Sequence, residues 1–238
     1  VASSCDVFFY RLAEVSGIDM IHEKLQKFGF GAKTYIDLYG EKIGLLPSRE
    51  WKNESRQAAW YPGETLNVGI GQGYFLSTPL QLANATSLLA SGGSSVTPHL
   101  FLRSIDRINN EVSNFNYSGN KNEIEIDTES LHVVNEAMWR VIYDKSIGTA
   151  SHLKKIDSLE FAGKTGTAQV YNLDKGKTGK KSLQDHALFI SFAPFVSPEI
   201  VVTVIVDNGG SGSSVAAPIA RDIINFYFEN IKSKVAMQ

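Results

Sequence analysis

The sequence has a single cysteine, almost no excess charge of either sign and no long apolar run, and each shortage excludes a class of protein. The one cysteine, Cys5, cannot form a disulfide within the 238-residue chain, which excludes a disulfide scaffold. Lysine and arginine number 23 and aspartate and glutamate 25, so the formal net charge is −2. A chain without a basic field is not typical of proteins that bind nucleic acid or an anionic membrane surface. We therefore expect no nucleic-acid partner.

Membrane-spanning and targeting segments are also missing from the sequence. No stretch approaches the roughly 20 consecutive apolar residues of a transmembrane helix, and the first residues do not have a signal-peptide pattern. The chain starts at Val1 rather than at methionine, which suggests a piece of a longer protein whose anchor or address lies upstream. With 43% hydrophobic and 20% charged residues and no repeat, the composition is that of a globular domain with a sizeable core.

Apolar residues recur at helical spacing mainly in the first part of the chain. The helix expected after Thr78 has Pro79 at its first position, and small or apolar residues around most of its circumference predict that it is buried. Asp127 or Thr128 is expected to cap the next helix. No period is sustained over residues 40–73, so we expect a long ordered loop there, and such loops are usually functional. The predicted helices cover residues 7–15, 18–28, 80–90, 131–142 and 217–227.

Strand patterns dominate the last part of the chain. β-rich runs over residues 159–171, 187–195 and 200–207 predict three strands, and the tight turn before the last run predicts an antiparallel hairpin. Residues 94–126 are expected to form two short strands around a polar excursion. Helices followed by antiparallel strands and a final helix indicate a sheet covered by helices, of the α+β or mixed α/β class.

The sharpest local pattern is a lysine and two hydroxyl residues in an otherwise apolar strand. Lys164 and Thr165 are flanked by Gly163 and Gly166, and Thr167 follows. A lysine in such a strand costs free energy unless it faces a cleft and an anion, and the glycines allow a ligand or another backbone to approach closely. The alternative is an edge strand with one solvated lysine, because chance readily supplies a Lys-Thr-Gly triplet. The strand alone leaves both interpretations open.

A serine and a carboxylate two positions apart precede the first predicted helix. By themselves, Ser4 and Asp6 are typical of a helix cap. Together with the Lys-Thr-Gly strand that follows in the expected order, they fit the pattern of enzymes with a serine acyl-enzyme, which combine Ser-x-x-Lys, Ser-x-Asn and Lys-Thr-Gly motifs. Asp6 stands where asparagine is commoner, so the second motif is a variant.

The nucleophile motif itself, Ser-x-x-Lys, has no suitable match in the chain. Ser151 and Lys154 have the right spacing, but they lie downstream of Ser4 and only about ten residues before Lys164. We reject them as the nucleophile pair. We expect the missing serine and lysine upstream of Val1.

Eight segments in this order resemble the transpeptidase domain of class B penicillin-binding proteins, most closely the elongation-type enzymes called penicillin-binding protein 2. The likeness spans nearly the whole chain, and the ordered set is far more specific than any single motif. It implies that residues 1–238 are the C-terminal two-thirds of one transpeptidase domain, with the nucleophile segment, the pedestal and the membrane anchor upstream. The segments are residues 4–10, 44–48, 60–64, 69–73, 78–81, 163–170, 185–187 and 192–194.

The resemblance implies a fold and a reaction. The implied fold is an antiparallel sheet of about five strands with helices on both faces. The implied reaction is D,D-transpeptidation, in which the upstream serine attacks the D-Ala-D-Ala carbonyl of a peptidoglycan stem peptide, expels D-alanine and passes the acyl group to an amine on a neighbouring strand. β-Lactams would acylate the same serine.

The resemblance also assigns roles to residues of this chain. Lys164, Thr165, Gly166 and Thr167 would bind the substrate carboxylate, and the Thr167 N–H would stabilise the oxyanion together with the N–H of the missing serine. Ser4 would relay a proton between the missing lysine, Lys164 and the leaving amine, and Asp6 would orient this network. The catalytic residues expected in the chain are therefore Ser4, Asp6, Lys164 and Thr167.

The implied surroundings are those of a cell-wall enzyme. The expected partners are stem peptides as donor and acceptor, β-lactam antibiotics and a glycosyltransferase of the elongation complex, and the expected location is the bacterial inner membrane with the catalytic domain in the periplasm. No cofactor is required. Some relatives bind zinc at the position of Cys5, but no set of His or Asp partners with ligand spacing accompanies it, so a structural zinc remains an alternative.

Two other functions stay open at this point. A serine β-lactamase shares the three motifs and would also hydrolyse its acyl-enzyme, and Glu64 with Asn67 superficially resembles the Glu-Asn pair of one lactamase class. A non-catalytic scaffold or β-lactam-sensing module would keep the cleft without the nucleophile. Among the remaining residues, His186 is interpreted as a hydrogen-bonded structural residue and the lysines of 175–181 as a solvated loop.

Overall fold

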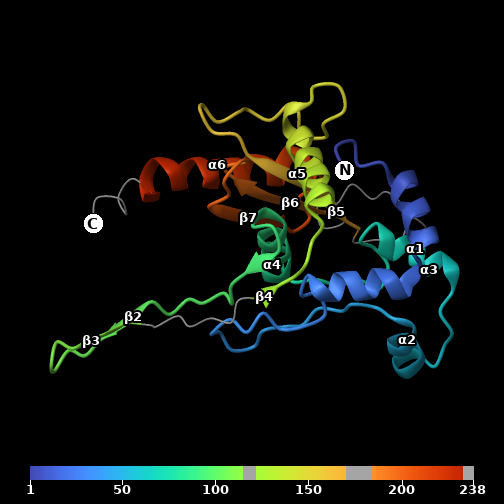
Figure 1. The fold of residues 1–238 in the computed structure, drawn as a ribbon, viewed down its shortest axis with the longest axis horizontal. Coiled ribbons are helices and arrows are strands. Elements are labelled where there is room, and N and C mark those ends of the chain that lie inside the picture. Colours follow the sequence, from blue (N-terminus) through green and yellow to red (C-terminus); the bar gives the residue numbers. More distant parts are fainter. Residues whose placement is uncertain (115–121, 170–183, 233–238) are drawn as a thin grey trace.

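The computed structural model of the chain describes residues 1–114, 122–169 and 184–232, in which helices pack on both faces of an antiparallel sheet (Figure 1). The helices are α1 (Asp6–Lys27), α2 (Arg49–Arg56), α3 (Pro62–Gly69), α4 (Pro79–Ala90), α5 (Thr128–Tyr143) and α6 (Ala217–Phe226), with π-helical turns η2 (Gly212–Ala216) and η3 (Tyr227–Lys232) on either side of α6. The strands are β1 (Ser94–Ser95), β2 (Arg103–Ile105), β3 (Val112–Asn114), β4 (Asn122–Glu123), β5 (Ala162–Ala168), β6 (His186–Ala193) and β7 (Ile200–Val206).

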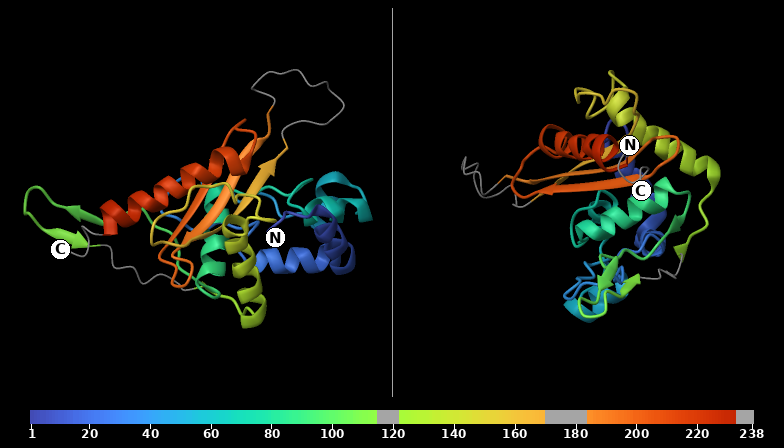
Figure 2. Two further views of the ribbon diagram at one scale, coloured as in Figure 1. Left: turned by 90° about the horizontal axis from the view of Figure 1, so that it is seen from above. Right: turned by 90° about the vertical axis from the view of Figure 1, so that its left-hand side faces the viewer.

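The central sheet has the strand order β5-β6-β7, and both pairings are antiparallel. Thr165 pairs with Phe189, so these side chains share one face, whereas Lys164 pairs with Ile190 and shares the other. Figure 2 shows α6 on one face of the sheet and α4 on the opposite face. Because strand side chains alternate, neighbouring residues of β5 serve different layers of the molecule.

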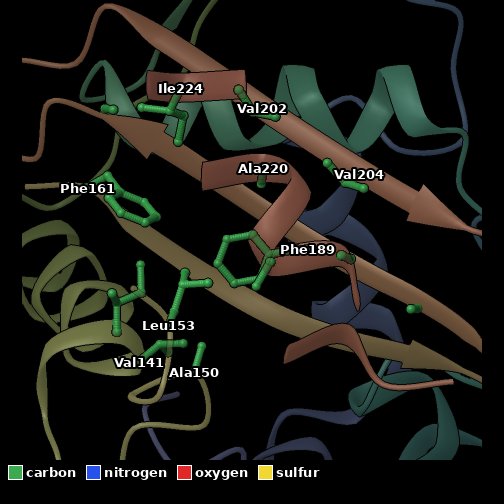
Figure 3. Packing of buried hydrophobic residues seen from close by; sticks show 14 residues of the cluster. Val141, Ala150, Leu153, Phe161, Phe189, Val202, Val204, Ala220 and Ile224 are labelled. Atoms are coloured by element: carbon green, nitrogen blue, oxygen red, sulfur yellow. The ribbon is translucent and has the colours of Figure 1, made fainter. Parts of the chain in front are cut away.

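The largest buried cluster lies between the sheet, α5 and α6. Phe161 and Phe189 are fully buried there, and Figure 3 shows Phe189 beside Ala220 of α6. Burying one such aromatic side chain contributes about 1.5–3 kcal/mol. Phe189 also explains one glycine, because a Cβ on Gly163 would lie 2.4 Å from the Phe189 ring. Packing in this core fixes the position of β5 relative to α5 and α6.

The first part of the chain forms a helical unit beside the sheet. The two helices expected over 7–28 are halves of α1, interrupted at Gly17, whose φ of 71° leaves the helical region. Helix α3 packs tightly against α1, since a Cβ on Gly69 would lie 2.4 Å from the Cβ of Ala13. The expected helices over 80–90 and 131–142 and the last helix are confirmed as α4, α5 and α6.

The loop expected over residues 40–73 contains two short helices, and that prediction was wrong in this respect. Ser48 caps α2 by accepting a hydrogen bond from the Trp51 N–H at 3.0 Å, and α3 begins at Pro62. A buried ion pair joins them, with the Lys52 Nζ 2.5 Å from a Glu64 carboxylate oxygen. Both helices have eight residues, which is too short for a sustained apolar period to show in the sequence.

The expected class, α/β with an antiparallel sheet between helices, is confirmed, but the strand count differs. The expectation was about five strands, whereas the sheet in the described residues has three. The strands expected within 94–126 pair separately as the ribbons β1–β4 and β2–β3. All residues of β2 and β3 are exposed, so this ribbon has no apolar face to add to the sheet and projects from the body in Figure 1. Residues 115–121 of the expected excursion lie outside the described part.

We predict that Gly163→Ala destabilises the fold by about 1–3 kcal/mol, because the added methyl group overlaps the buried Phe189 ring. Gly63→Ala is the matched control, since a Cβ at Gly63 meets nothing within 4 Å and lies inside a helix, where alanine is favoured. Urea unfolding of both variants measures the difference. Equal stability of the two would contradict the packing argument.

Candidate active site

The structure brings Ser4 and Lys164 together across 160 positions of sequence, and the Lys164 Nζ donates a hydrogen bond to the Ser4 Oγ. Ser4 lies just before α1 with a left-handed φ of 49°, in a turn closed by its N–H to the Val1 carbonyl at 3.1 Å. Cys5 is the N-cap of α1, and no side chain caps the helix. The interpretation of Ser4 and Asp6 as a simple helix cap is therefore wrong, because the Ser4 hydroxyl is turned toward Lys164.

Lys164 is held in a partly desolvated position on β5. Its Nζ also donates to the Thr165 carbonyl at 2.7 Å and approaches the Thr165 Oγ1 at 3.3 Å. Burial lowers the pKa of Lys164 to about 8, although the charge of Asp6 acts in the opposite direction and raises it. Near neutral pH this ammonium group is charged but loses its proton more readily than an exposed lysine.

These residues line one cavity of about 560 Å³. One wall comes from α1 and from the end of α3, and the other wall is β5. The expected catalytic and substrate-binding residues, Ser4, Asp6 and residues 164–167, all line this cavity, whereas Cys5 does not. The lining residues are Ser4, Asp6, Phe9, Gly69, Ile70, Gln72, Lys164, Thr165, Gly166, Thr167 and Gln169.

Strand β5 is an edge strand of its sheet, so every second residue directs its backbone groups away from β6. The carbonyls of Thr165 and Thr167 accept hydrogen bonds from the side chains of Lys164 and Gln72, so the backbone groups of Thr165 and Thr167 face outward. In an antiparallel strand the N–H of a residue points to the same side as its carbonyl. The Thr167 N–H is therefore directed to the cavity side, where the predicted oxyanion donor must lie.

Thr149 is a site residue that the sequence analysis missed. Its Oγ1 lies 3.0 Å from the Thr165 Oγ1, and its N–H donates to the Ala2 carbonyl at 3.3 Å. It thus contacts both the segment that leads to Ser4 and the strand that carries Lys164. No motif marks Thr149, because its partner lies 16 positions away in a strand whose register the sequence does not show.

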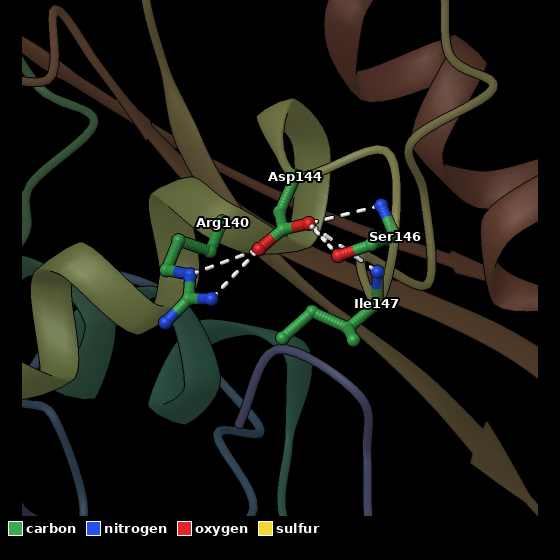
Figure 4. A network of polar contacts seen from close by, with 4 residues as sticks. All are labelled: Arg140, Asp144, Ser146 and Ile147. Carbon is green, nitrogen blue, oxygen red and sulfur yellow. Dashed lines mark hydrogen bonds and ion pairs between the residues drawn. The ribbon is translucent and has the colours of Figure 1, made fainter.

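Thr149 follows a turn at the end of α5 that several hydrogen bonds hold in place. The Asp144 carboxylate accepts hydrogen bonds from the Arg140 guanidinium, from the Ser146 N–H and hydroxyl and from the Ile147 N–H (Figure 4). The bonds from Ser146 and then those from Arg140 hold the pKa of Asp144 far below its usual range. Gly148 follows where a Cβ would lie within 2.7 Å of three carbonyl oxygens. In the sequence this turn is marked by Asp144, by Ser146 two positions later and by Gly148 two positions after that.

Comparisons with known proteins show the family of the chain. The family model described as "Penicillin binding protein transpeptidase domain" matches residues 1–225. The chain belongs to this family. Peptidoglycan D,D-transpeptidase MrdA of Haemophilus influenzae is 38% identical over 95% of this chain and 35% of its own length, and its namesake from Escherichia coli K12 is 34% identical over 93% of the chain and 35% of its length.

Solved structures of transpeptidases share the fold. Pseudomonas aeruginosa PBP2, in complex with WCK 5153, is 39% identical, with a TM-score of 0.78 over 95% of this chain and 47% of that one. Helicobacter pylori PBP2, in complex with MreC, is 29% identical, with a TM-score of 0.81 over 97% and 39%. The expected resemblance to the PBP2 type is confirmed. This transpeptidase domain spans about a third of the length of the curated relatives, at 35% of the H. influenzae protein.

Cys5 and His186 do not line the cavity. The His186 Nδ1 accepts a hydrogen bond from the Asn208 N–H at 3.0 Å, which confirms its structural interpretation. Cys5 is exposed, and the described residues contain no group of three or more His, Cys, Asp or Glu that could hold a metal ion. A zinc ligand at Cys5 thus stays a prediction. The lysines of 175–181 lie outside the described residues, and no helix in the described part is long and apolar enough to cross a membrane.

We predict that Thr149→Val in the full-length protein weakens noncovalent binding of benzylpenicillin by about three- to tenfold, the worth of one hydrogen bond, because Thr165 loses the contact that orients its hydroxyl. Thr149→Ser keeps a hydroxyl at the same place and should bind as the parent does. Pre-steady-state acylation kinetics measure the binding constant. Parental binding by the valine variant would show that the contact is incidental.

Proposed function

We propose that the protein containing this chain is a peptidoglycan D,D-transpeptidase that cross-links stem peptides through a serine acyl-enzyme and that β-lactams acylate. The observation that carries the proposal is the contact between Ser4 and Lys164 at one end of a cavity that Thr165 and Thr167 also line. The fold family and the MrdA relatives support the same reaction. The nucleophilic serine and its lysine belong to a Ser-x-x-Lys segment expected upstream of Val1.

In the first half of the reaction, the serine Oγ attacks the carbonyl carbon of the penultimate D-alanine, and the peptide bond to the last D-alanine breaks. The carbonyl oxygen becomes negatively charged in the transition state, and the cavity-facing N–H of Thr167 would donate to it. The proton of the serine passes to its lysine, and the Ser4 hydroxyl is placed to hand a proton to the leaving amine, because it already accepts one hydrogen bond from Lys164.

In the second half, an amine of a neighbouring stem peptide attacks the ester carbonyl, the bond to the serine breaks, and the serine recovers its proton.

Before the first half, the terminal carboxylate of the donor peptide must be bound, and this needs a cation and hydroxyl donors in fixed positions. Lys164 and the hydroxyls of Thr165 and Thr167 provide this chemistry from one strand, which packs at Gly163 against the buried Phe189 ring. Asp6 acts on the same site by raising the pKa of Lys164.

The location and partners follow from this function. We propose that the domain works in the periplasm, held at the inner membrane by a segment upstream, and that it assembles with a glycosyltransferase of the elongation complex. A solved relative, 29% identical to this chain and part of a peptidoglycan synthase complex that coordinates polymerization and crosslinking, supports such an assembly. The stem peptides, as donor and acceptor, and the β-lactams would all enter the cavity beside β5.

The β-lactamase alternative is weakened by the position of Glu64. Its carboxylate accepts hydrogen bonds from the Lys52 Nζ and from the Tyr61 N–H, and it does not line the cavity. Burial raises the pKa of Glu64, but these hydrogen bonds outweigh burial and lower it. A carboxylate with its oxygens engaged in this way is not placed to activate a hydrolytic water.

Intact mass after incubation with benzylpenicillin tests the proposal on the full-length protein and on this chain alone. We expect a stable adduct on the full-length protein only, and Lys164→Ala should slow its formation by about a hundredfold, through loss of a charged donor in the site. Lys42→Ala, at an exposed lysine, is the matched control for the change of charge. No adduct on the full-length protein would favour the non-catalytic module, and rapid turnover of the antibiotic would favour the β-lactamase.

The pH dependence of acylation gives a second test. Lys164 is protonated below pH about 8, so a role for its ammonium group predicts that acylation slows as the pH rises through about 8. Asp6→Asn removes the charge that raises this pKa, so the same decline should begin at a lower pH. Stopped-flow acylation rates from pH 6 to 10 measure both profiles. A decline that stays in place in the Asp6 variant would contradict the assigned coupling.

A further inference from the structure

Gln72 lines the cavity and lies in a loop between two glycines. It stands between Gly71 and Gly73, whose φ angles of 75° and 73° lie in the left-handed region. Its N–H donates to the Asn67 carbonyl at 2.9 Å, which ties the loop to α3. Since α3 packs closely against α1, the backbone of Gln72 is fixed to the wall of the cavity opposite β5.

The Gln72 side chain bridges the two walls. Its Nε2 donates to the Thr167 carbonyl at 3.0 Å, across 95 positions of sequence. Thr167 lies one residue before the end of β5, and residues 170–183 are outside the described part. Few backbone hydrogen bonds hold an edge strand near its end, so a side-chain hydrogen bond at Thr167 contributes strongly to fixing the position of this residue.

This bond changes what the edge of β5 presents to a ligand. The outward carbonyls of Thr165 and Thr167 are both engaged, that of Thr165 by Lys164 and that of Thr167 by Gln72. The outward N–H groups of the same two residues remain to face the cavity. The edge therefore presents donors, which suits an oxyanion or a carboxylate better than a neutral peptide strand.

We propose that Gln72 is a positioning residue for acyl transfer, which holds Thr167 so that its N–H meets the oxyanion that forms in the transition state. This inference rests on the proposed transpeptidase function. Gln72 acts through Thr167 and need not touch the reacting atoms. Its loss should slow the acylation step and leave the noncovalent binding of β-lactam nearly unchanged, because oxyanion stabilisation is needed only in the transition state.

The test compares three variants of the full-length protein by pre-steady-state acylation with benzylpenicillin. At pH 7.5, Gln72→Glu and Gln72→Met should acylate about tenfold more slowly than the parent, since neither side chain can donate to the Thr167 carbonyl. Gln57→Glu is the matched control, because Gln57 is an exposed glutamine that does not line the cavity and the substitution adds the same charge. The control should acylate within about twofold of the parent, and thermal melting should be similar in all variants.

Acidic pH separates positioning from a general disturbance of the loop. A protonated carboxyl group can donate a hydrogen bond, so the rate of Gln72→Glu relative to the parent should recover as the pH falls from 7.5 toward 4.5, near the ordinary glutamate pKa of about 4.3. Gln72→Met should show no recovery. This rescue depends on a donor at one atom, and a purely structural role would not produce it.

Three results would overturn the inference. Acylation of Gln72→Met at the parental rate would show that the bond is dispensable, and faster acylation would show that Gln72 only blocks the carbonyl. Equal losses in Gln72→Glu and Gln57→Glu would assign the effect to charge alone. Each of these requires an acylating parent, so each is distinct from a failure of the proposed function, in which the parent itself forms no adduct and the inference falls with it.

Discussion

The hydrogen bond from Lys164 to Ser4 joins the two parts of the structure that make the site, the start of α1 and the strand β5. Its formation has a local cost. Ser4 adopts a left-handed backbone conformation, and α1 begins without a side-chain cap, although a capping serine would contribute about 1 kcal/mol. Residues that break a local rule in this way are expected at functional sites.

Two close contacts hold β5 in the position that this bond requires. Gly163 lies beneath the Phe189 ring, and Gly212 of η2 lies so close to β5 that a Cβ there would be 2.4 Å from the Gly166 carbonyl oxygen. Lys164 stands between these contacts on the opposite face, toward α4. Packing on the face opposite to Lys164 therefore fixes the position of the strand, which can carry a partly buried cation.

The sequence was sufficient for elements with a long period or a strong cap, and for the site residues that belong to ordered motifs. Helices α4 and α5, the pairing of β6 with β7 and the meeting of Ser4 with Lys164 were all predictable on that basis. Helices α2 and α3 were missed because eight residues give only about two turns. Within residues 94–126 two short strands were expected and the described residues have four, because their composition does not show which partner each strand chooses. Thr149 and Gln72 could not be found, because each acts through one hydrogen bond to a distant residue.

Asp6 at first seems to oppose a site that binds a carboxylate, because it places a second negative charge beside the cavity. In the structure, burial and the Asp6 charge have opposite effects on the pKa of Lys164. Burial lowers the pKa of Lys164 to about 8, and the Asp6 charge is the contribution that raises it. With asparagine in that place, the pKa of Lys164 would be lower and a larger share of its side chain would be neutral near physiological pH. The carboxylate of Asp6 thus keeps the ammonium charged in a partly desolvated site, while the engaged carbonyls of Thr165 and Thr167 leave N–H donors toward the ligand. An anion entering the cavity meets the cation and the donors on β5, and Asp6 lies on the other wall.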